Sequence, residues 1–292
     1  MTTRTVRQVV NTVIQKEGAG FYVRRPMPTR SLDNVDPFLM LDHFGPTTYR
    51  PGEAKGAPNH PHRGFETVSY ILEGTMQHKD SVGNSGLIGP GDVQWMTAGS
   101  GIVHDEMPSD EIMKNGGTME GFQLWVNLPK KHKMIKPKYQ EKKASEIPVI
   151  TPSEGVKVKV IAGTSNSTTA IITTHTPIMY LHFTLDVGKQ FTQAIPAEFV
   201  SFAYVFRGVG KFGPQHRETK EGQMAVFEVG SDEGVVEFEN TGTKPLEFLL
   251  LGGKPLNEPI ARHGPFVMNT QDEIQQAFMD YYSGRFGKIN FE

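Results

Sequence analysis

Four residues whose types could bind a metal ion occur as two closely spaced pairs. His60 and His62 flank one residue, and His104 and Glu106 flank another later in the chain. In a β-strand, side chains two positions apart point to the same face. Two such strands inside a small barrel would direct three imidazoles and one carboxylate at one point, and these groups coordinate Fe, Zn, Mn, Ni or Cu. The spacing therefore predicts a metal site.

Short strands bounded by turns must position these residues. Gly56-Ala57-Pro58 precedes the first pair, and a glycine-rich turn at 98–101 precedes the second. Turns of this kind place ligands at strand ends, near the mouth of a barrel. Short β-favouring runs flanked by Gly, Pro or Glu-Gly follow at residues 67–72, 92–96 and 122–126.

Composition favours a β-rich protein and excludes several functions. The 292 residues include 31 Gly and 20 Pro, which is typical of many short strands. The net charge of −2 argues against direct binding of nucleic acid. The absence of cysteine excludes disulfides and thiolate sites. We see neither a secretory signal nor a membrane span, and we expect an intracellular protein.

A lysine-rich segment at residues 129–145 separates two strand-rich halves. It has seven lysines within 130–143, opposed only by Glu141. One interpretation is a localisation or nucleic-acid signal, and the other is a solvated linker. We favour the linker, because both sides are typical of separate β units. The expected division is a metal-binding domain at 1–128, the linker, and a second domain at 146–292.

The second half weakly repeats the first, which indicates a duplicated unit. Residues 70–74 correspond to 204–208, and residues 91–95 correspond to 222–226. On this alignment the three histidines have as counterparts Ala194, Pro196 and Val235, and only Glu237 keeps a ligand type. We therefore expect the second unit to lack a metal. Gly208 to Gly213 fits GxGxxG, but no helix follows it, so we expect a hairpin turn.

The chain is expected to end in a helix at about 271–283. Thr270 and Glu273 form a capping-box pattern, and apolar residues at 274, 278 and 281 or 282 follow at helical spacing. This apolar face should pack on a barrel. We expect His263, just before the helix, to be hydrogen-bonded and not a ligand. Three aromatic residues either line the pocket or pack in the core, and both readings stay open: Phe44, Phe65 and Trp95.

The sequence around the ligand pairs resembles that of the cupin superfamily and, more specifically, that of the pirin family. HPHRGFETV at 60–68 resembles the first cupin motif, and Gly86 through Gly91-Asp92 to His104 resembles the second. Four longer stretches resemble pirins over essentially the whole chain: NHPHRGFETVSYILEG, GDVQWMTAGSGIVHDEMP, GFQLWVNLP and HGPFVMNT.

The resemblance implies an all-β bicupin, in which two antiparallel β-barrels pack face to face. It implies one iron, as Fe(II) or Fe(III), in the N-terminal barrel only. The ligands carried over by position are His60, His62, His104 and Glu106. Asp105 should point away from the metal. Glu66 holds the place of the Glu ligand of many cupins, but in pirins Glu106 has that role, so Glu66 should border the pocket at most.

The resemblance also implies a function. Some pirins open the ring of the flavonol quercetin with O₂, so we expect a 2,3-dioxygenase-type enzyme in which Glu106 is the catalytic base. The alternative is a redox-sensing transcriptional co-regulator, cytoplasmic or nuclear, that binds DNA-binding proteins through a surface dependent on the iron state. A monomer is expected. His43 and His78 lie in the same half and could border the pocket, but we expect each to be a core or surface residue.

Overall fold

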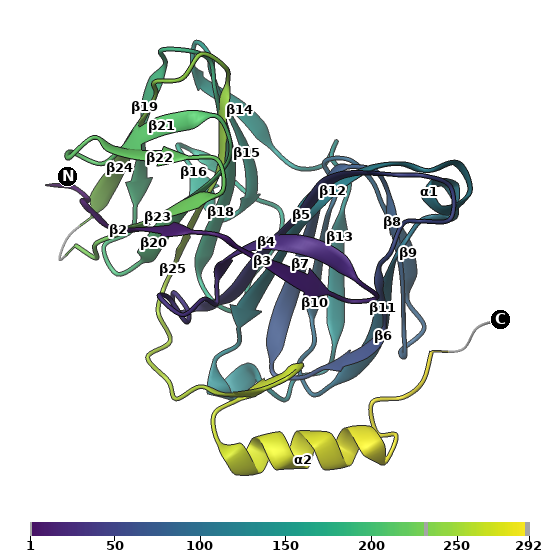
Figure 1. Ribbon diagram of the computed structural model, residues 1–292. Helices are drawn as coiled ribbons and strands as arrows, with labels where there is room; N and C mark the ends of the chain where they lie inside the picture. The colour runs from purple at the N-terminus through teal and green to yellow at the C-terminus, as the bar shows by residue number, and fades with distance from the viewer. Residues whose placement is uncertain (1, 231–232, 290–292) are drawn as a thin grey trace. The chain divides into compact units, whose positions relative to one another are not determined.

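The computed structural model describes residues 2–230 and 233–289, and short strands dominate it. The main ladders are antiparallel, such as β5 (Phe38–Tyr49) with β12 (Gly117–Asn127). The helices of the described residues are α1 (Asp110–Asn115), α2 (Gln271–Tyr282) and the 3₁₀ turn η1 (Lys130–His132) (Figure 1). No helix in this part of the chain has the length and apolar character needed to cross a membrane.

The chain divides into two compact units, and each is built from separate stretches of sequence. One comprises residues 14–25, 38–144 and 257–292, and we call it the histidine unit because it holds all four predicted ligands. The other comprises residues 1–13, 26–37 and 145–256, and we call it the aromatic unit after its phenylalanine-rich core.

The histidine unit contains a seven-stranded and a four-stranded sheet. The larger has the order β13-β10-β7-β12-β5-β4-β3, and the smaller β6-β11-β8-β9. The strands not yet bounded are β3 (Val13–Glu17), β4 (Phe21–Met27), β6 (Ala57–His62), β7 (Phe65–Glu73), β8 (Met76–Asp80), β9 (Ser85–Ile88), β10 (Val93–Thr97), β11 (Ile102–Pro108) and β13 (Lys138–Lys142).

The aromatic unit repeats this plan with a seven-stranded sheet, β14-β15-β18-β25-β20-β23-β2, and a smaller one that joins β1, β24, β21, β22 and β19. A short ladder links β16 and β17. The bounds are β1 (Thr2–Thr3), β2 (Val6–Asn11), β14 (Val149–Ser153), β15 (Val156–Ala162), β16 (Thr164–Ser165), β17 (Thr168–Thr169), β18 (Ile178–Leu185), β19 (Gln190–Ile195), β20 (Val200–Arg207), β21 (Val209–Phe212), β22 (Arg217–Lys220), β23 (Gln223–Phe227), β24 (Gly234–Asn240) and β25 (Leu246–Gly253).

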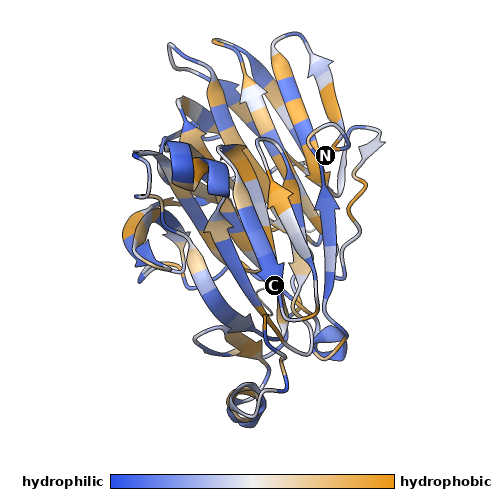
Figure 2. Cartoon of the chain, turned by 90° about the vertical axis from the view of Figure 1, so that its right-hand side faces the viewer, coloured by the Kyte–Doolittle hydropathy of each residue, from blue (hydrophilic) through white to orange (hydrophobic). Residues whose placement is uncertain are grey.

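Alternating hydrophobicity drives the strands of the aromatic unit together. Buried and partly buried residues alternate along strands such as β24. Figure 2 shows alternating orange and blue bands along several strands of the chain. The inward residues form one apolar cluster that contains Phe183, Phe212, Phe238 and Phe248. The rings of Phe183 and Phe248 stack with centroids 5.2 Å apart. Burial of such rings contributes most of the stabilisation of a small β unit.

The division of the chain differs from the expected one. The predicted linker at 129–145 contains η1 and β13, and β13 pairs with β10 through the whole of Lys138–Lys142. The start of the chain also lies outside the domain expected for it, because β2 pairs with β23 of the aromatic unit. Propensity and charge did not show this, since a lysine-rich strand is stable when its backbone completes the edge of a sheet.

The C-terminal helix confirms its sequence pattern and lies in the histidine unit, not in the unit that precedes it in sequence. Thr270 caps α2, and Glu273 completes the capping box. Ile274 and Ala277 are buried in a cluster with Val103 of β11. β26 (Ala261–His263) and β27 (Phe266–Met268) form the hairpin that leads into the helix. Figure 1 shows α2, in yellow, beside the strands of this unit.

Candidate metal centre

The structure brings three of the four predicted ligands into one cluster on two neighbouring strands. His60 of β6 lies directly opposite His104 of β11 in the antiparallel register, and His62 lies opposite Ile102. Opposed residues share a face of the sheet, so all three imidazoles point to the same side. One ligand atom of each histidine lies within 4.8 Å of those of the other two.

The ring nitrogens of this cluster are arranged as in a metal site. Nδ1 of His60 lies 2.8 Å from the carbonyl of Pro58, and Nδ1 of His62 lies 3.4 Å from that of Pro265. If each Nδ1 donates its proton to the carbonyl, each Nε2 keeps a free lone pair. Neither ring nitrogen of the buried His104 has a hydrogen-bond partner among residues 2–230 and 233–289.

Such an unpartnered buried nitrogen is unfavourable, and a metal ion would satisfy it. Burial lowers the pKa of His62 and of His104 well below the usual value, and the neighbouring His60 lowers both further. The imidazoles of His62 and His104 are therefore neutral near pH 7, which is the form that coordinates metals. The residues present fit a metal ion.

Glu106 shares the face of His104 but is held by other partners. The regular register between β11 and β8 places His104 opposite Asp80 and Glu106 opposite His78. The Glu106 carboxylate lies outside the 4.8 Å cluster. It accepts hydrogen bonds from Ser69 Oγ at 2.6 Å and from Gln123 Nε2 at 2.8 and 3.1 Å. A carboxylate offers about four lone pairs, so it retains coordination capacity. Its role as a ligand stays a prediction.

Two aromatic rings form an apolar wall beside the cluster. The ring centroids of Phe65 and Trp125 lie 5.0 and 5.3 Å from that of His62, and 4.3 Å from each other. Phe65 is fully buried, whereas Trp125 is partly exposed. Phe65 packs in a core cluster with Leu39 and Val267, as the core reading had it, and its lining of a pocket stays a prediction. Trp125 was not singled out.

Ser69, Gln123 and Trp125 are site residues that sequence reasoning missed. The signal was present in the strand alternation. Phe65 and Ser69 share one face of β7, and Gln123 and Trp125 share one face of β12. The pairings that bring β7 and β12 next to each other, Ser69 with Gln123 among them, join residues far apart in sequence. No local pattern gives that register.

A second polar group lies on the neighbouring strands β8, β10 and β13. His78, which is 1% exposed, forms a hydrogen bond with Glu141 of β13, and Gln94 Nε2 donates to the same carboxylate at 2.8 Å. The rings of His78 and Tyr139 stack with centroids 5.2 Å apart. His43 is likewise buried, 3.0 Å from Glu120. Of the core and surface alternatives, the core is right for both histidines.

Several other candidates lie away from the cluster. Phe65 and Ser69 point toward the histidines, so Glu66 and Val68 point to the opposite face of β7. Trp95 pairs with Val68 and shares that face, so of its two readings core packing is right. Glu66 does not border the pocket, because Thr97 Oγ donates to it at 2.6 Å on that same far face.

Two further candidates have other roles. Phe44 packs in a separate cluster around Ile71. His263 is exposed, with its ring against that of Phe278 at 5.3 Å, and it lies outside the histidine cluster.

The internal repeat predicts the right pair of strands, but its alignment is one residue off in which side chains point inward. Ala194 and Val235 do pair, as His60 and His104 do. However, Ala194 is exposed, and the buried residues beside this pair are Gln193 and Val236. Glu237 therefore points outward and is no equivalent of Glu106. Gly208 has a φ of +82° and joins β20 to β21, which lie in different sheets. β21 pairs with β22 through the turn at 213–216, so the glycine-rich residues lead into a hairpin and not into a helix.

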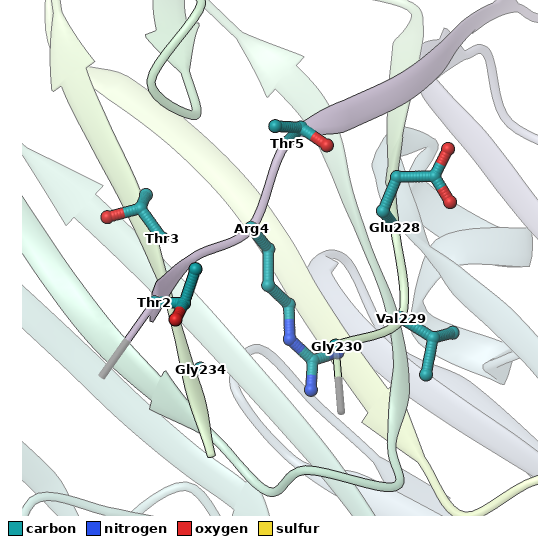
Figure 3. Close-up of a pocket in the computed structure, with 8 residues that line it drawn as sticks. All are labelled: Thr2, Thr3, Arg4, Thr5, Glu228, Val229, Gly230 and Gly234. Atoms are coloured by element: carbon teal, nitrogen blue, oxygen red, sulfur yellow. The ribbon is translucent and has the colours of Figure 1, made fainter. Parts of the chain in front are cut away.

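The aromatic unit contains a cavity of about 230 Å³ where β1 lies beside β24. Figure 3 shows Arg4 and Glu228 among its lining side chains. The Arg4 guanidinium is already occupied, since it donates to the carbonyls of Pro196 at 2.7 Å and Ala197 at 3.1 Å. Arg4 therefore attaches the first strand to its unit. The chemistry of the candidate site lies with the histidines.

Comparison with known proteins agrees with this fold. The family models Pirin and Pirin C-terminal cupin domain match residues 20–126 and 180–287. The chain is 46% identical over 284 residues to a pirin-like protein of Solanum lycopersicum, covering 96% of this chain and 93% of that protein. It is 45% identical over 275 residues to Pirin of Homo sapiens, covering 94% and 90%.

A solved structure matches the chain over its whole length. The crystal structure described as quercetin 2,3-dioxygenase from Acinetobacter baumannii superposes with a TM-score of 0.91 at 37% sequence identity, covering 99% of this chain and 100% of that one. The two β units and the three-histidine cluster define a bicupin with a candidate metal centre. Within that class, the chain belongs to the pirin family.

Proposed function

We propose that the histidine unit binds one iron ion through His60, His62, His104 and Glu106. The support is the convergence of three imidazoles, two of them oriented by backbone carbonyls. His104 adds a buried pair of ring nitrogens with no partner among the described residues. Three nitrogens and one carboxylate oxygen would leave two positions of an octahedral ion open, as in non-heme iron oxygenases.

We further propose that the protein opens the ring of a flavonol with O₂, as a quercetin 2,3-dioxygenase does. The observation that supports this most is the match over 99% of the chain to the Acinetobacter baumannii protein of that name, at 37% identity. A bound ferrous ion would supply the open coordination positions and the redox chemistry that O₂ requires. Ring opening would consume O₂ and release carbon monoxide.

Glu106 is the base in this proposal. It would take the proton of the flavonol 3-hydroxyl on a carboxylate oxygen. Ser69 and Gln123 hold that carboxylate through three hydrogen bonds, which fixes its direction before substrate arrives. Proximity of a positioned base typically contributes a factor of about 10²–10⁴ to a proton transfer.

The aromatic wall suits a flat aromatic substrate. Phe65 and Trp125 stand edge-on to His62 at 72° and 76° and would place an apolar surface beside the metal. Trp125 is partly exposed, whereas Phe65 is buried. A substrate ring packed there would exclude water from the reacting atoms.

The test is oxygen uptake with quercetin by purified protein loaded anaerobically with Fe(II). We expect no turnover without air and turnover once air is admitted. His60→Ala and Glu106→Ala should abolish turnover, whereas His263→Ala, an exposed histidine of the same unit, should leave it unchanged. Turnover that survives His60→Ala would refute the site, and turnover that survives Glu106→Ala would refute the base.

Iron-loaded protein that never consumes quercetin would refute the flavonol proposal. Binding to a DNA-binding protein that depends on the iron oxidation state, without turnover, would then favour the redox-sensing co-regulator. The metal content of the same sample separates loss of the metal site from a wrong substrate.

A further inference from the structure

The C-terminal segment, residues 261–289, contacts the corner of the chain that carries His62. Besides the Pro265 carbonyl near His62 Nδ1, the backbone N–H of Val267 donates to the carbonyl of Arg63 at 3.0 Å. Arg63 and Phe266 form a parallel β-bridge. Arg63, which follows the second predicted ligand His62, is therefore paired directly with the C-terminal segment.

The Arg63 side chain connects this corner to the second ligand strand and to α2. Its Nε donates to the carbonyl of Ser100 at 2.7 Å, in the turn that leads into β11 and His104. One terminal nitrogen lies 2.9 Å from the carboxylate of Asp280 on α2. The guanidinium lies over the ring of Phe286, 4.6 Å from its centroid. Arg63 is 4% exposed, so this ion pair is sheltered from water.

Lys133 and Gly64 fix the same corner from the other side. Lys133 is 1% exposed, and its Nζ donates to the carbonyls of Gly64 at 2.8 Å and Val267 at 3.0 Å. Gly64 has a φ of +88°, and a Cβ there would lie 1.9 Å from the Val267 carbonyl oxygen. The C-terminal segment thus packs against the backbone with no room for a side chain.

We propose that the C-terminal segment is a positioning element of the metal centre, so that docking of this segment and metal binding are thermodynamically coupled. Groups that orient a ligand histidine change metal affinity, typically by about 10- to 100-fold when they are removed. Coupling is reciprocal, so metal bound to the histidines must also hold the C-terminal segment in place. This inference rests on the proposed metal site but not on the flavonol reaction.

The first test measures affinity for Co²⁺, whose visible absorption reports the coordination geometry. Asp280→Asn removes the charge that holds Arg63, and we expect about 10-fold weaker Co²⁺ binding with altered absorption bands. Arg63→Lys should act similarly, because an ammonium cannot bridge the Ser100 carbonyl and Asp280 in the same way. Asp272→Asn, an exposed charge on the same helix, should leave affinity within about twofold of the parent.

The second test needs no substitution and follows amide hydrogen exchange with and without Co²⁺. We expect exchange in α2 to slow by at least about 10-fold on metal binding, while β24 of the aromatic unit is unchanged. In His60→Ala, addition of Co²⁺ should not slow α2.

Two results would overturn the coupling: affinity and bands of Asp280→Asn equal to those of Asp272→Asn, or unchanged exchange in α2 when the Co²⁺ bands show that metal is bound. Failure of the parent protein to bind Co²⁺ would instead refute the metal site itself. Inactivity toward quercetin would affect neither conclusion.

Discussion

At the scale of single residues, the centre depends on side chains that set the direction of others. His104 has buried ring nitrogens without partners among the described residues, whereas Glu106 accepts three hydrogen bonds from two side chains. The ligand types were readable from sequence because spacing by two is a local property of a strand. Ser69 and Gln123 were not, because they reach Glu106 from strands of the other sheet.

Removal of the Ser69 hydroxyl should impair turnover more than folding. Ser69→Ala leaves Glu106 with Gln123 alone, and loss of a hydrogen bond to a charged group costs about 1.5–3 kcal/mol. We expect kcat for quercetin to fall about 10-fold or more while the melting temperature changes by a few degrees. Ser85→Ala, an exposed serine on β9, is the matched control. Equal activity of the two variants would remove Ser69 from the catalytic arrangement.

Glu66 should make the stability of the protein depend on pH. Burial raises its pKa from 4.5 to about 7, against the lowering effect of the Thr97 hydroxyl. A folded-state pKa above the unfolded value means that the neutral acid is stabilising below about pH 4.5, and that this contribution is lost as pH rises through 7. The shift corresponds to at most about 3 kcal/mol.

Glu66→Gln keeps a neutral side chain at every pH. It should therefore be more stable than the parent at pH 8 and nearly equal at pH 5, as thermal unfolding at both values would show. Glu73→Gln, an exposed carboxyl on the same strand, should show no such difference. A parent protein whose stability relative to Glu66→Gln is the same at both pH values would contradict the assignment.

At the scale of elements, local patterns predicted what a segment is better than where it pairs. The capping box placed α2 correctly, because a cap is defined by residues three apart. The repeat between the two halves identified β19 and β24 as partners, but its alignment was shifted by one residue. Such a shift assigns each side chain to the wrong face of the strand. The lysine-rich segment was taken for a linker because neighbouring strands, not its own composition, make β13 a strand.

Amide exchange would distinguish a paired β13 from a linker. Residues 138–142 should be protected to nearly the degree of β10, its partner, and on the order of 10-fold or more above residues 254–260, which form no regular structure. Exchange in 138–142 as fast as in 254–260 would restore the linker interpretation.

At the scale of the whole molecule, two units of the same plan are filled differently. Phenylalanine side chains occupy the interior of the aromatic unit, whereas the histidine unit keeps a polar interior of histidines, glutamates and glutamine. The expected bicupin is therefore asymmetric in chemistry though not in architecture. Sequence showed the asymmetry through residue types, while the exchange of the chain ends between the units followed only from long-range pairing.

Metal addition should stabilise one unit and leave the other unchanged. Ligand at about 100 times its Kd adds about 2.7 kcal/mol to the free energy of unfolding. We expect Fe(II), added anaerobically, to raise the melting temperature of the histidine unit, and a chelator or His104→Ala to remove the effect. Elemental analysis should give one metal per chain. Two metals per chain, or stabilisation of the aromatic unit, would contradict the asymmetry.

The split composition of the histidine unit has a consequence for biosynthesis. Most of its strands precede residue 145, yet Pro265, Val267 and Asp280 follow the aromatic-unit segment 145–256. During translation, more than a hundred residues of the aromatic unit are synthesised after the three histidines. In that interval His60, His62 and His104 lack their contacts with the C-terminal segment. A nascent chain therefore cannot hold a metal in this geometry until residues 265–280 have followed the long aromatic-unit segment.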